Sequence, residues 1–126
     1  MGQLKFLNDF TKSLGASSWW KMSRKYYMMK NGTKVYVGKP YLAGFYQDKS
    51  YFITEKYPGI SQIEQIVQKA LDNKNVPYKS NAMYNVFVWK DINLDWNQVH
   101  CGKRSLANLT QGKVVYSAFI HPDVIE

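Results

Sequence analysis

The sequence is poor in the side chains that most often carry catalysis and metal binding. Its 126 residues include one cysteine, Cys101, and two histidines, His100 and His121. A lone cysteine cannot form a disulfide within the chain, which indicates an intracellular, reducing compartment. The adjacent His100 and Cys101 would point in different directions on a strand or helix, and the paired short spacings of zinc sites are missing. We therefore predict no catalytic residues, no metal site and no enzymatic activity.

Phosphate-binding glycine loops and long apolar runs are also missing. Neither GxxxxGK[ST] nor GxGxxG occurs, so no cofactor and no small-molecule substrate are indicated. The apolar run at 114–120, VVYSAFI, is far shorter than the roughly 20 residues of a membrane-spanning helix. Because no apolar segment follows the basic start, we do not predict a secretory signal peptide.

Acidic residues are scarce in the first third of the chain. Residues 1–40 carry eight basic side chains and one acid, Asp9, so this third holds seven of the eight net positive charges. Such a segment attracts the phosphates of nucleic acid or lipid headgroups, or an acidic protein surface, although a solvated lysine surface has the same composition. Arginine is scarce too, since fifteen of the seventeen basic residues are lysines. Specific base and phosphate recognition favours arginine, so this composition weakens the case for sequence-specific binding.

The rest of the composition is typical of a folded protein. Hydrophobic residues make up 45% of the chain and aromatic residues 16%, with ten tyrosines. No internal repeat, low-complexity tract or linker divides it. We predict one α+β domain over residues 1–126, in which N-terminal amphipathic helices accompany a small, mainly antiparallel sheet of about five strands packed against a central helix. Residues 1–32 form a basic, aromatic-rich N-terminal segment of this domain.

The first eighteen residues predict an amphipathic helix. Leu4, Leu7, Leu14 and either Phe10 or Thr11 lie near one helical face, and a glycine at position 15 is a natural end point. The stretch is also basic, serine-containing and poor in acids, which makes it weakly similar to a mitochondrial targeting segment, although it lacks arginine. We expect an ordered helix packed on the domain, with a mitochondrial or membrane-peripheral location as a secondary expectation.

Residues 17–32, SSWWKMSRKYYMMKNG, allow two interpretations, of which the first is a helix. Ser17 or Ser18 would cap its start and Asn31-Gly32 would end it. One face of this helix would be apolar and the opposite face basic. The apolar face would carry Trp19, Met22, Tyr26 and Met29, and the basic face Lys21, Arg24 and Lys25.

The second interpretation is a β-hairpin. Asn31-Gly32 would then be a two-residue turn, Met28 would face Val35, and Tyr26 would face Val37. Residues 17–30 contain no β-branched residue and show no alternation with a period of two, so the helix is favoured.

The remaining elements are expected in the order strands, helix, strands. Residues 34–38 alternate like a strand, and 43–47 with 50–56 predict a hairpin around Asp48-Lys49. Residues 61–75 predict the clearest helix, opened by a Ser61–Glu64 capping box and ended by Val76-Pro77. The last part of the chain predicts a central strand at 83–89, a long connection with one short helical piece at 93–112, and a final strand at 113–120.

The expected order of residues 2–73, a helix, three strands and a helix, resembles that of the double-stranded RNA-binding domain. That family has a lysine cluster at the start of its last helix, where this sequence has Glu64 in SQIEQIVQK, so the resemblance is one of element order alone. RNA binding stays an alternative function, because the basic residues of positions 21–39 could contact phosphates while exposed aromatic rings stack on bases. These basic residues are Lys21, Arg24, Lys25, Lys30, Lys34 and Lys39.

These observations favour a non-catalytic binding protein. We predict an accessory or adaptor subunit of a larger assembly, soluble or membrane-associated, that docks on protein partners or an anionic surface through its basic, aromatic N-terminal third. A component of a ribonucleoprotein and a small phage-type inhibitor of a single target are the alternatives. The predicted contact residues are Trp19, Trp20, Arg24, Lys25, Tyr27 and Lys30.

Overall fold

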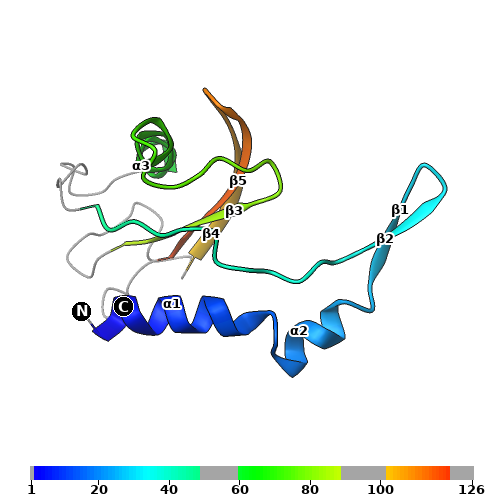
Figure 1. Cartoon of the computed structure of the whole chain (residues 1–126). Helices are drawn as coiled ribbons and strands as arrows, with labels where there is room; N and C mark the ends of the chain where they lie inside the picture. Colours follow the sequence, from blue (N-terminus) through cyan, green and yellow to red (C-terminus); the bar gives the residue numbers. More distant parts are fainter. Residues whose placement is uncertain (1, 49–59, 89–101, 120–126) are drawn as a thin grey trace. The chain divides into compact units, whose positions relative to one another are not determined.

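The computed structural model describes residues 2–48, 60–88 and 102–119 of a mixed α+β protein. The chain divides into two compact units, an N-terminal unit, Met1–Phe45, and a C-terminal unit, Tyr46–Glu126 (Figure 1). The interpretation of residues 1–126 as a single domain stays a prediction.

The N-terminal unit begins with two successive helices. Helix α1 spans Gly2–Leu14 and helix α2 spans Ser18–Ser23, so the amphipathic helix predicted at the start of the chain is confirmed. Between them, Gly15 is buried because Lys39 and Pro40 lie directly against it, which leaves no room for a Cβ atom. Of the two predicted capping residues, Ser17 and Ser18, the structure uses Ser17. Its side-chain oxygen accepts a 3.1 Å hydrogen bond from the Trp20 amide at the start of α2.

A two-stranded antiparallel hairpin follows these helices. Strand β1 spans Tyr27–Lys30 and strand β2 spans Thr33–Tyr36 (Figure 1). Both turn residues have positive φ, 51° at Asn31 and 78° at Gly32, as a type I′ turn requires. The favoured prediction of one helix through residue 30 is therefore wrong, because Asn31-Gly32 acts as a hairpin turn. The alternative prediction is confirmed for its strand pair Met28 and Val35.

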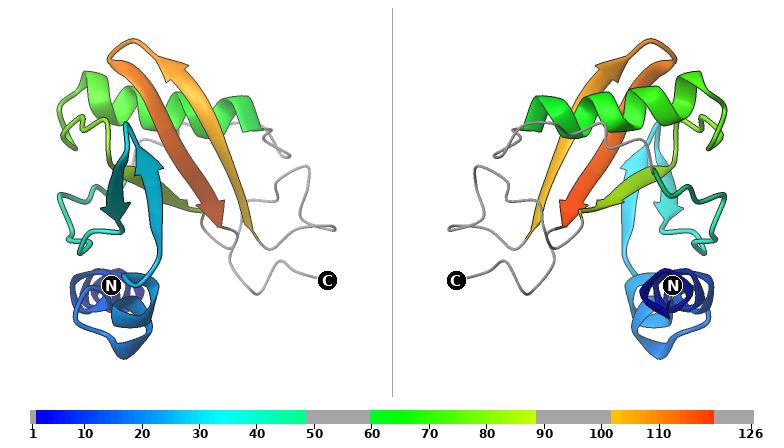
Figure 2. Two further views of the ribbon diagram at one scale, coloured as in Figure 1. Left: turned by 90° about the vertical axis from the view of Figure 1, so that its right-hand side faces the viewer. Right: turned by 90° about the vertical axis from the view of Figure 1, so that its left-hand side faces the viewer.

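The C-terminal unit contains a three-stranded sheet covered on one face by a helix. Helix α3 spans Ile60–Asp72, and the strands are β3, Met83–Phe87, β4, Gly102–Leu109, and β5, Gly112–Phe119. The strand order is β3-β5-β4, with β3 parallel and β4 antiparallel to β5. Figure 2 shows α3 lying across one face of this sheet.

The hydrophobic core of the described residues lies between α3 and this sheet. Helix residues Ile63, Val67 and Leu71 recur at helical spacing and face alternate residues of β5. The buried set is completed by Val88, Ala107, Val114, Tyr116 and Ala118. All of these side chains belong to the C-terminal unit. The described apolar side chains of the N-terminal unit are half-buried or exposed.

Polar contacts fix the β4–β5 turn to the last turns of α3. The Gln68 side-chain amide donates to Asp72 at 2.8 Å and to Gln111 at 2.9 Å, while its oxygen accepts from the Thr110 amide at 2.9 Å. Gln111 in turn donates to Asp72 at 2.9 Å. The side chains of Gln68, Asp72 and Gln111 are therefore hydrogen-bonded to one another or to the turn, and these hydrogen bonds hold the turn on the helix.

Several predicted elements differ from the structure. The strands form a two-stranded and a three-stranded sheet, with a parallel pair, so the single, mainly antiparallel sheet of about five strands is wrong. The predicted strand at 43–47 has no regular structure, and its partner at 50–56 lies outside the described residues. Strand β3 lies at an edge of the three described strands, because β5 occupies the centre. Strand β4 occupies the second half of the connection predicted at 93–112, and the first half of that connection, residues 93–101, lies outside the described residues.

The predicted capping box also takes a different form. Helix α3 already includes Ile60, so Ser61 lies inside the first turn and not ahead of it. Glu64 accepts a 2.8 Å hydrogen bond from the Tyr116 hydroxyl of the sheet, and so connects the helix to the central strand.

Candidate docking surface

The six predicted contact residues come from three consecutive pieces of the N-terminal unit. Trp19 and Trp20 lie on α2, Arg24 and Lys25 lie between α2 and the hairpin, and Tyr27 and Lys30 lie at the two ends of β1. Five of the six are exposed, and Trp20 is half-buried. Because the stretch is a short helix followed by a strand, they do not share one helical face.

Trp20 was predicted to contact a partner, but in the structure it connects two segments of the N-terminal unit. Its indole Nε1 donates a 2.8 Å hydrogen bond to the Gly38 carbonyl, which connects α2 to the segment after β2. Trp19, by contrast, is 63% exposed, and its ring centroid lies 5.8 Å from that of Trp20 with the two ring planes tilted at 54°. Of the two tryptophans, Trp19 is therefore the one available to a partner.

Replacing Trp20 by phenylalanine is expected to loosen the N-terminal unit. The change removes the hydrogen bond to Gly38, which is worth about 0.5–1.5 kcal/mol, so the hairpin amides should exchange their hydrogens about 2- to 10-fold faster. Hydrogen–deuterium exchange of the full chain measures this. Trp19→Phe is the matched control and should leave exchange unchanged, and equal acceleration by both variants would contradict the structural role of Trp20.

The hairpin carries an aromatic cluster that was only partly predicted. Tyr27 pairs with Tyr36 across the strands, and their ring centroids lie 5.5 Å apart at an angle of 53°. The ammonium of Lys34 lies 4.6 Å from the centroid of the Tyr27 ring. Since the pairs Tyr27–Tyr36 and Met29–Lys34 alternate with the other pairs of the ribbon, these four side chains form one face, which we call the tyrosine face.

The tyrosine face is open to a partner. Tyr27 is 50% and Tyr36 53% exposed, and Met29 and Lys34 are also exposed. Tyr36 was missed as a contact residue, and Lys34 was considered only as a phosphate contact in the RNA-binding alternative, because the helical interpretation of residues 17–30 did not bring them next to Tyr27. The turn dipeptide Asn31-Gly32, followed by the alternating residues 33–37, was the signal for this pairing.

The basic residues around the hairpin are not matched by acids. From Lys12 to Gln47 the sequence contains seven basic side chains and no aspartate or glutamate. Within the described part of the N-terminal unit, the ion pair given by the structure joins Lys5 to Asp9 of α1, and this pair raises the pKa of Lys5 and lowers that of Asp9. Among the described residues, the basic side chains of positions 21–39 therefore have no ion-pair partner, which favours a positive potential around the tyrosine face.

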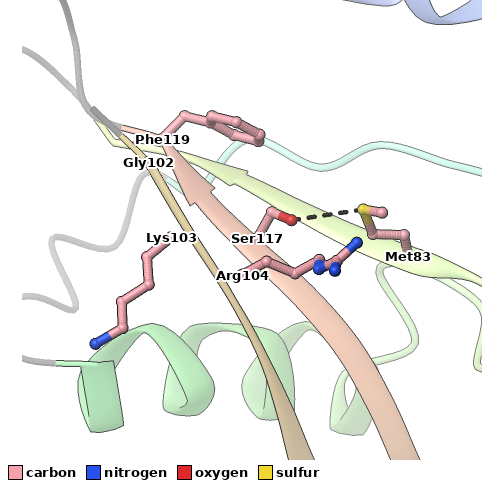
Figure 3. Close-up of a pocket in the computed structure, with 6 residues that line it drawn as sticks. All are labelled: Met83, Gly102, Lys103, Arg104, Ser117 and Phe119. Atoms are coloured by element: carbon pink, nitrogen blue, oxygen red, sulfur yellow. Dashed lines mark hydrogen bonds between the residues drawn. The ribbon is translucent and has the colours of Figure 1, made fainter. Parts of the chain in front are cut away.

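The C-terminal unit has a second exposed surface, the face of the sheet opposite α3. Met83, Phe87, Leu106 and Phe119 are exposed there, and the rings of Phe87 and Phe119 stack at 5.1 Å. Figure 3 shows the shallow hollow on this face, where the Ser117 hydroxyl donates to the Met83 sulfur at 3.5 Å. Arg104 lies on the same face, whereas Lys103 points to the other side of β4 (Figure 3). Among the described residues that line this hollow, Arg104 supplies a guanidinium and none supplies a carboxylate.

The described residues contain no metal-binding arrangement. No group of three or more histidine, cysteine, aspartate or glutamate side chains in residues 2–48, 60–88 and 102–119 is placed to hold an ion. His100, Cys101 and His121, the residues considered for catalysis, lie outside the described residues. No helix in the described part of the chain is both long and apolar enough to cross a membrane.

Comparison of the chain with protein-family models, curated protein sequences and solved structures gives no match. Its function is therefore argued from the surfaces described above.

Proposed function

We propose that this protein is a non-catalytic accessory subunit that docks on an anionic surface of a larger assembly through its N-terminal unit. The single observation that carries the proposal is the coincidence of charge and apolar exposure on the hairpin and on α2. The basic residues of this segment have no ion-pair partner among the described residues, and they alternate along the chain with exposed tyrosine, methionine and tryptophan side chains. A surface that only kept the protein in solution would need the charges but not the apolar side chains.

The structure of the N-terminal unit itself supports a docking role. A two-stranded hairpin is marginally stable alone in water, and here both of its faces are exposed. Met28 and Val35 pair on the face opposite the tyrosine face, and both are exposed. A partner that covers this ribbon would bury its aromatic and methionine side chains, the residue types enriched in interface centres, and its acidic groups would neutralise the lysines around them.

Size-exclusion chromatography of a gentle, low-salt extract of the native source tests this proposal. We expect the protein to elute well above its own 14.7 kDa, because a constitutive subunit stays with its assembly. Elution as a monomer in that extract would count against an accessory subunit.

Lysine variants, measured by the same chromatography, test whether the charges of the N-terminal unit are responsible for the association. The triple variant Lys25→Gln, Lys30→Gln, Lys34→Gln should move the protein toward the monomer position, because it removes three of the unneutralised charges. The matched control, Lys74→Gln, Lys103→Gln, Lys113→Gln, removes three exposed lysines of the C-terminal unit and should leave the elution unchanged. If both triple variants behave alike, net charge and not the N-terminal unit determines the association.

A further inference from the structure

The tyrosine face of the hairpin combines two groups that a single-stranded nucleic acid contacts at the same time. Two half-exposed rings, Tyr27 and Tyr36, lie side by side, and an ammonium, Lys34, lies beside them on the same face. Bases stack on aromatic rings whatever their sequence, and lysines neutralise the phosphates that connect them. The two rings of this face therefore match the bases of a polynucleotide strand, and the ammonium matches its phosphates.

The position of Lys34 fits this use. Its ammonium rests over the Tyr27 ring, a contact worth little at an exposed site, so it can move to a phosphate when a base covers the ring. Lys30 pairs with Thr33 and so lies on the opposite face of the ribbon, and Arg24 and Lys25 come just before the ribbon in the chain. These charges add to the positive potential that attracts a polynucleotide strand.

The predominance of lysine also agrees with a sequence-tolerant polynucleotide. Lysine holds a phosphate as a point charge, whereas fork-shaped recognition of carboxylates or of base edges relies on arginine. The basic residues of the hairpin strands are lysines, Lys30 and Lys34. An acidic protein surface would match the charge but would leave the paired rings without stacking partners.

A lipid surface matches this face less well. The tip of the hairpin, which would enter a bilayer first, is Lys30-Asn31-Gly32-Thr33 and is polar throughout. Helix α2 has six residues, which is too short for an amphipathic helix lying in the headgroup region.

We propose that the tyrosine face binds single-stranded nucleic acid, with bases stacked on Tyr27 and Tyr36 and a phosphate held by Lys34. This inference rests on the proposed function, because it names the chemistry of the anionic surface on which the N-terminal unit docks. It requires no particular base sequence.

Fluorescence anisotropy of labelled 20-nucleotide oligo(U) and oligo(dT), titrated with the full chain between 50 and 200 mM KCl, tests the proposal. Tyr27→Leu, Tyr36→Leu should weaken binding about 10- to 100-fold without changing the slope of log K against log salt, because the lysines remain. Lys34→Gln should reduce the magnitude of that slope by about 0.7, since each phosphate contact on a single strand contributes roughly 0.7. Oligo(U) and oligo(dT) distinguish RNA from DNA.

Two further variants serve as controls. Phe6→Leu, Phe10→Leu removes another exposed, stacked ring pair of the same unit, with centroids 6.5 Å apart, and should leave affinity within about two-fold. Tyr27→Phe, Tyr36→Phe keeps both rings and should also bind like the original chain, which separates ring stacking from loss of the hydroxyls or of the hairpin fold.

Several results would overturn the inference. The first is no binding of either oligonucleotide at 50 mM KCl. The second is equal weakening of binding by Phe6→Leu, Phe10→Leu and by Tyr27→Leu, Tyr36→Leu. The third is tyrosine-dependent binding of poly-glutamate or of phosphatidylserine vesicles in place of oligonucleotides. Nuclease treatment of the native extract separates this inference from the proposed function. A large complex that survives the nuclease refutes nucleic acid as the docking surface and leaves the subunit role standing, whereas a monomer in untreated extract refutes the subunit role.

Discussion

Replacing Tyr116 by alanine is expected to lower the free energy of unfolding of the C-terminal unit by about 3–5 kcal/mol. Tyr116 is 0% exposed at the centre of β5, and it packs between the sheet and α3. Its removal leaves a cavity among Ile63, Val67 and their neighbours and takes the donor away from Glu64. Urea unfolding of the full chain, followed by far-ultraviolet circular dichroism, measures the loss. A change below about 1 kcal/mol would contradict the position of this ring in the core.

Tyr116→Phe is the matched variant, because it keeps the ring and removes only the hydroxyl. It should cost about 1–2 kcal/mol at neutral pH, since the half-buried carboxylate of Glu64 loses its 2.8 Å donor. Burial of the hydroxyl, and next its hydrogen bond to Glu64, raises the pKa of Tyr116 from 10.0 to about 12. The stability contributed by the protonated hydroxyl is complete below pH 10 and is lost as pH rises toward 12. The advantage of the original chain over Tyr116→Phe should therefore shrink over this range, and a constant difference would refute the raised pKa.

Replacing Gly112 by alanine is expected to destabilise the C-terminal unit by about 2–3 kcal/mol. Gly112 follows the β4–β5 turn with φ of +144°, a conformation that side chains with a Cβ rarely adopt. The added Cβ would also collide with the hydroxyl of Tyr78, which donates a 3.3 Å hydrogen bond to the Lys113 carbonyl. Thermal unfolding of the full chain measures the effect.

Two comparisons separate the strain from the collision. Gly38→Ala is the matched control, because nothing lies within 4 Å of its added Cβ and its φ is not positive, and it should leave unfolding of the C-terminal unit unchanged. Gly112→Ala in a Tyr78→Ala background removes the collision but keeps the backbone strain, so part of the destabilisation should persist. If no destabilisation remains in that background, strain at Gly112 is not significant.

The helix α3 could be predicted from the sequence because its signal is local. Ile63, Val67 and Leu71 recur at helical spacing, and these three are the helix residues buried against the sheet. The hairpin was more difficult, because Tyr27, Met28 and Met29 suit a helix as well as a strand, and only the turn dipeptide Asn31-Gly32 distinguishes the two.

Sheet membership could not be predicted from the same local patterns. Strand β4 includes Lys103, Arg104 and Asn108, whose polarity suits an exposed connection, and only its pairing with β5 makes it a strand. Strand β3 has apolar residues on both faces, which suggested a central position. Met83 and Phe87 are instead exposed on the face opposite α3.

The sequence identified the segment that carries the candidate docking surface, but it did not identify all of the residues of that surface. Charge and aromatic composition identified residues 17–32, and Tyr27 and Lys30 lie on the hairpin. The hydrogen bond of Trp20 to Gly38 and the approach of Tyr36 to Tyr27 join residues from separate parts of the unit. Contacts of this kind depend on how the chain turns back on itself, and composition does not encode them.

The mixed pairing of the three-stranded sheet determines the order in which the C-terminal unit can assemble. Strands β4 and β5 are joined by a two-residue turn, and hairpins of this kind form on a timescale of about 1–10 μs. Strand β3 pairs with β5 in parallel, and Met83 meets Val115 across a separation of 32 positions, from 83 to 115. Closing that longer loop costs chain entropy before any contact offsets it, so we expect β3 and α3 to join a preformed β4–β5 hairpin. If the arrival of β3 at the central strand limits the folding rate, substitutions in β3 should slow folding more than equally destabilising substitutions in the exposed ends of the hairpin.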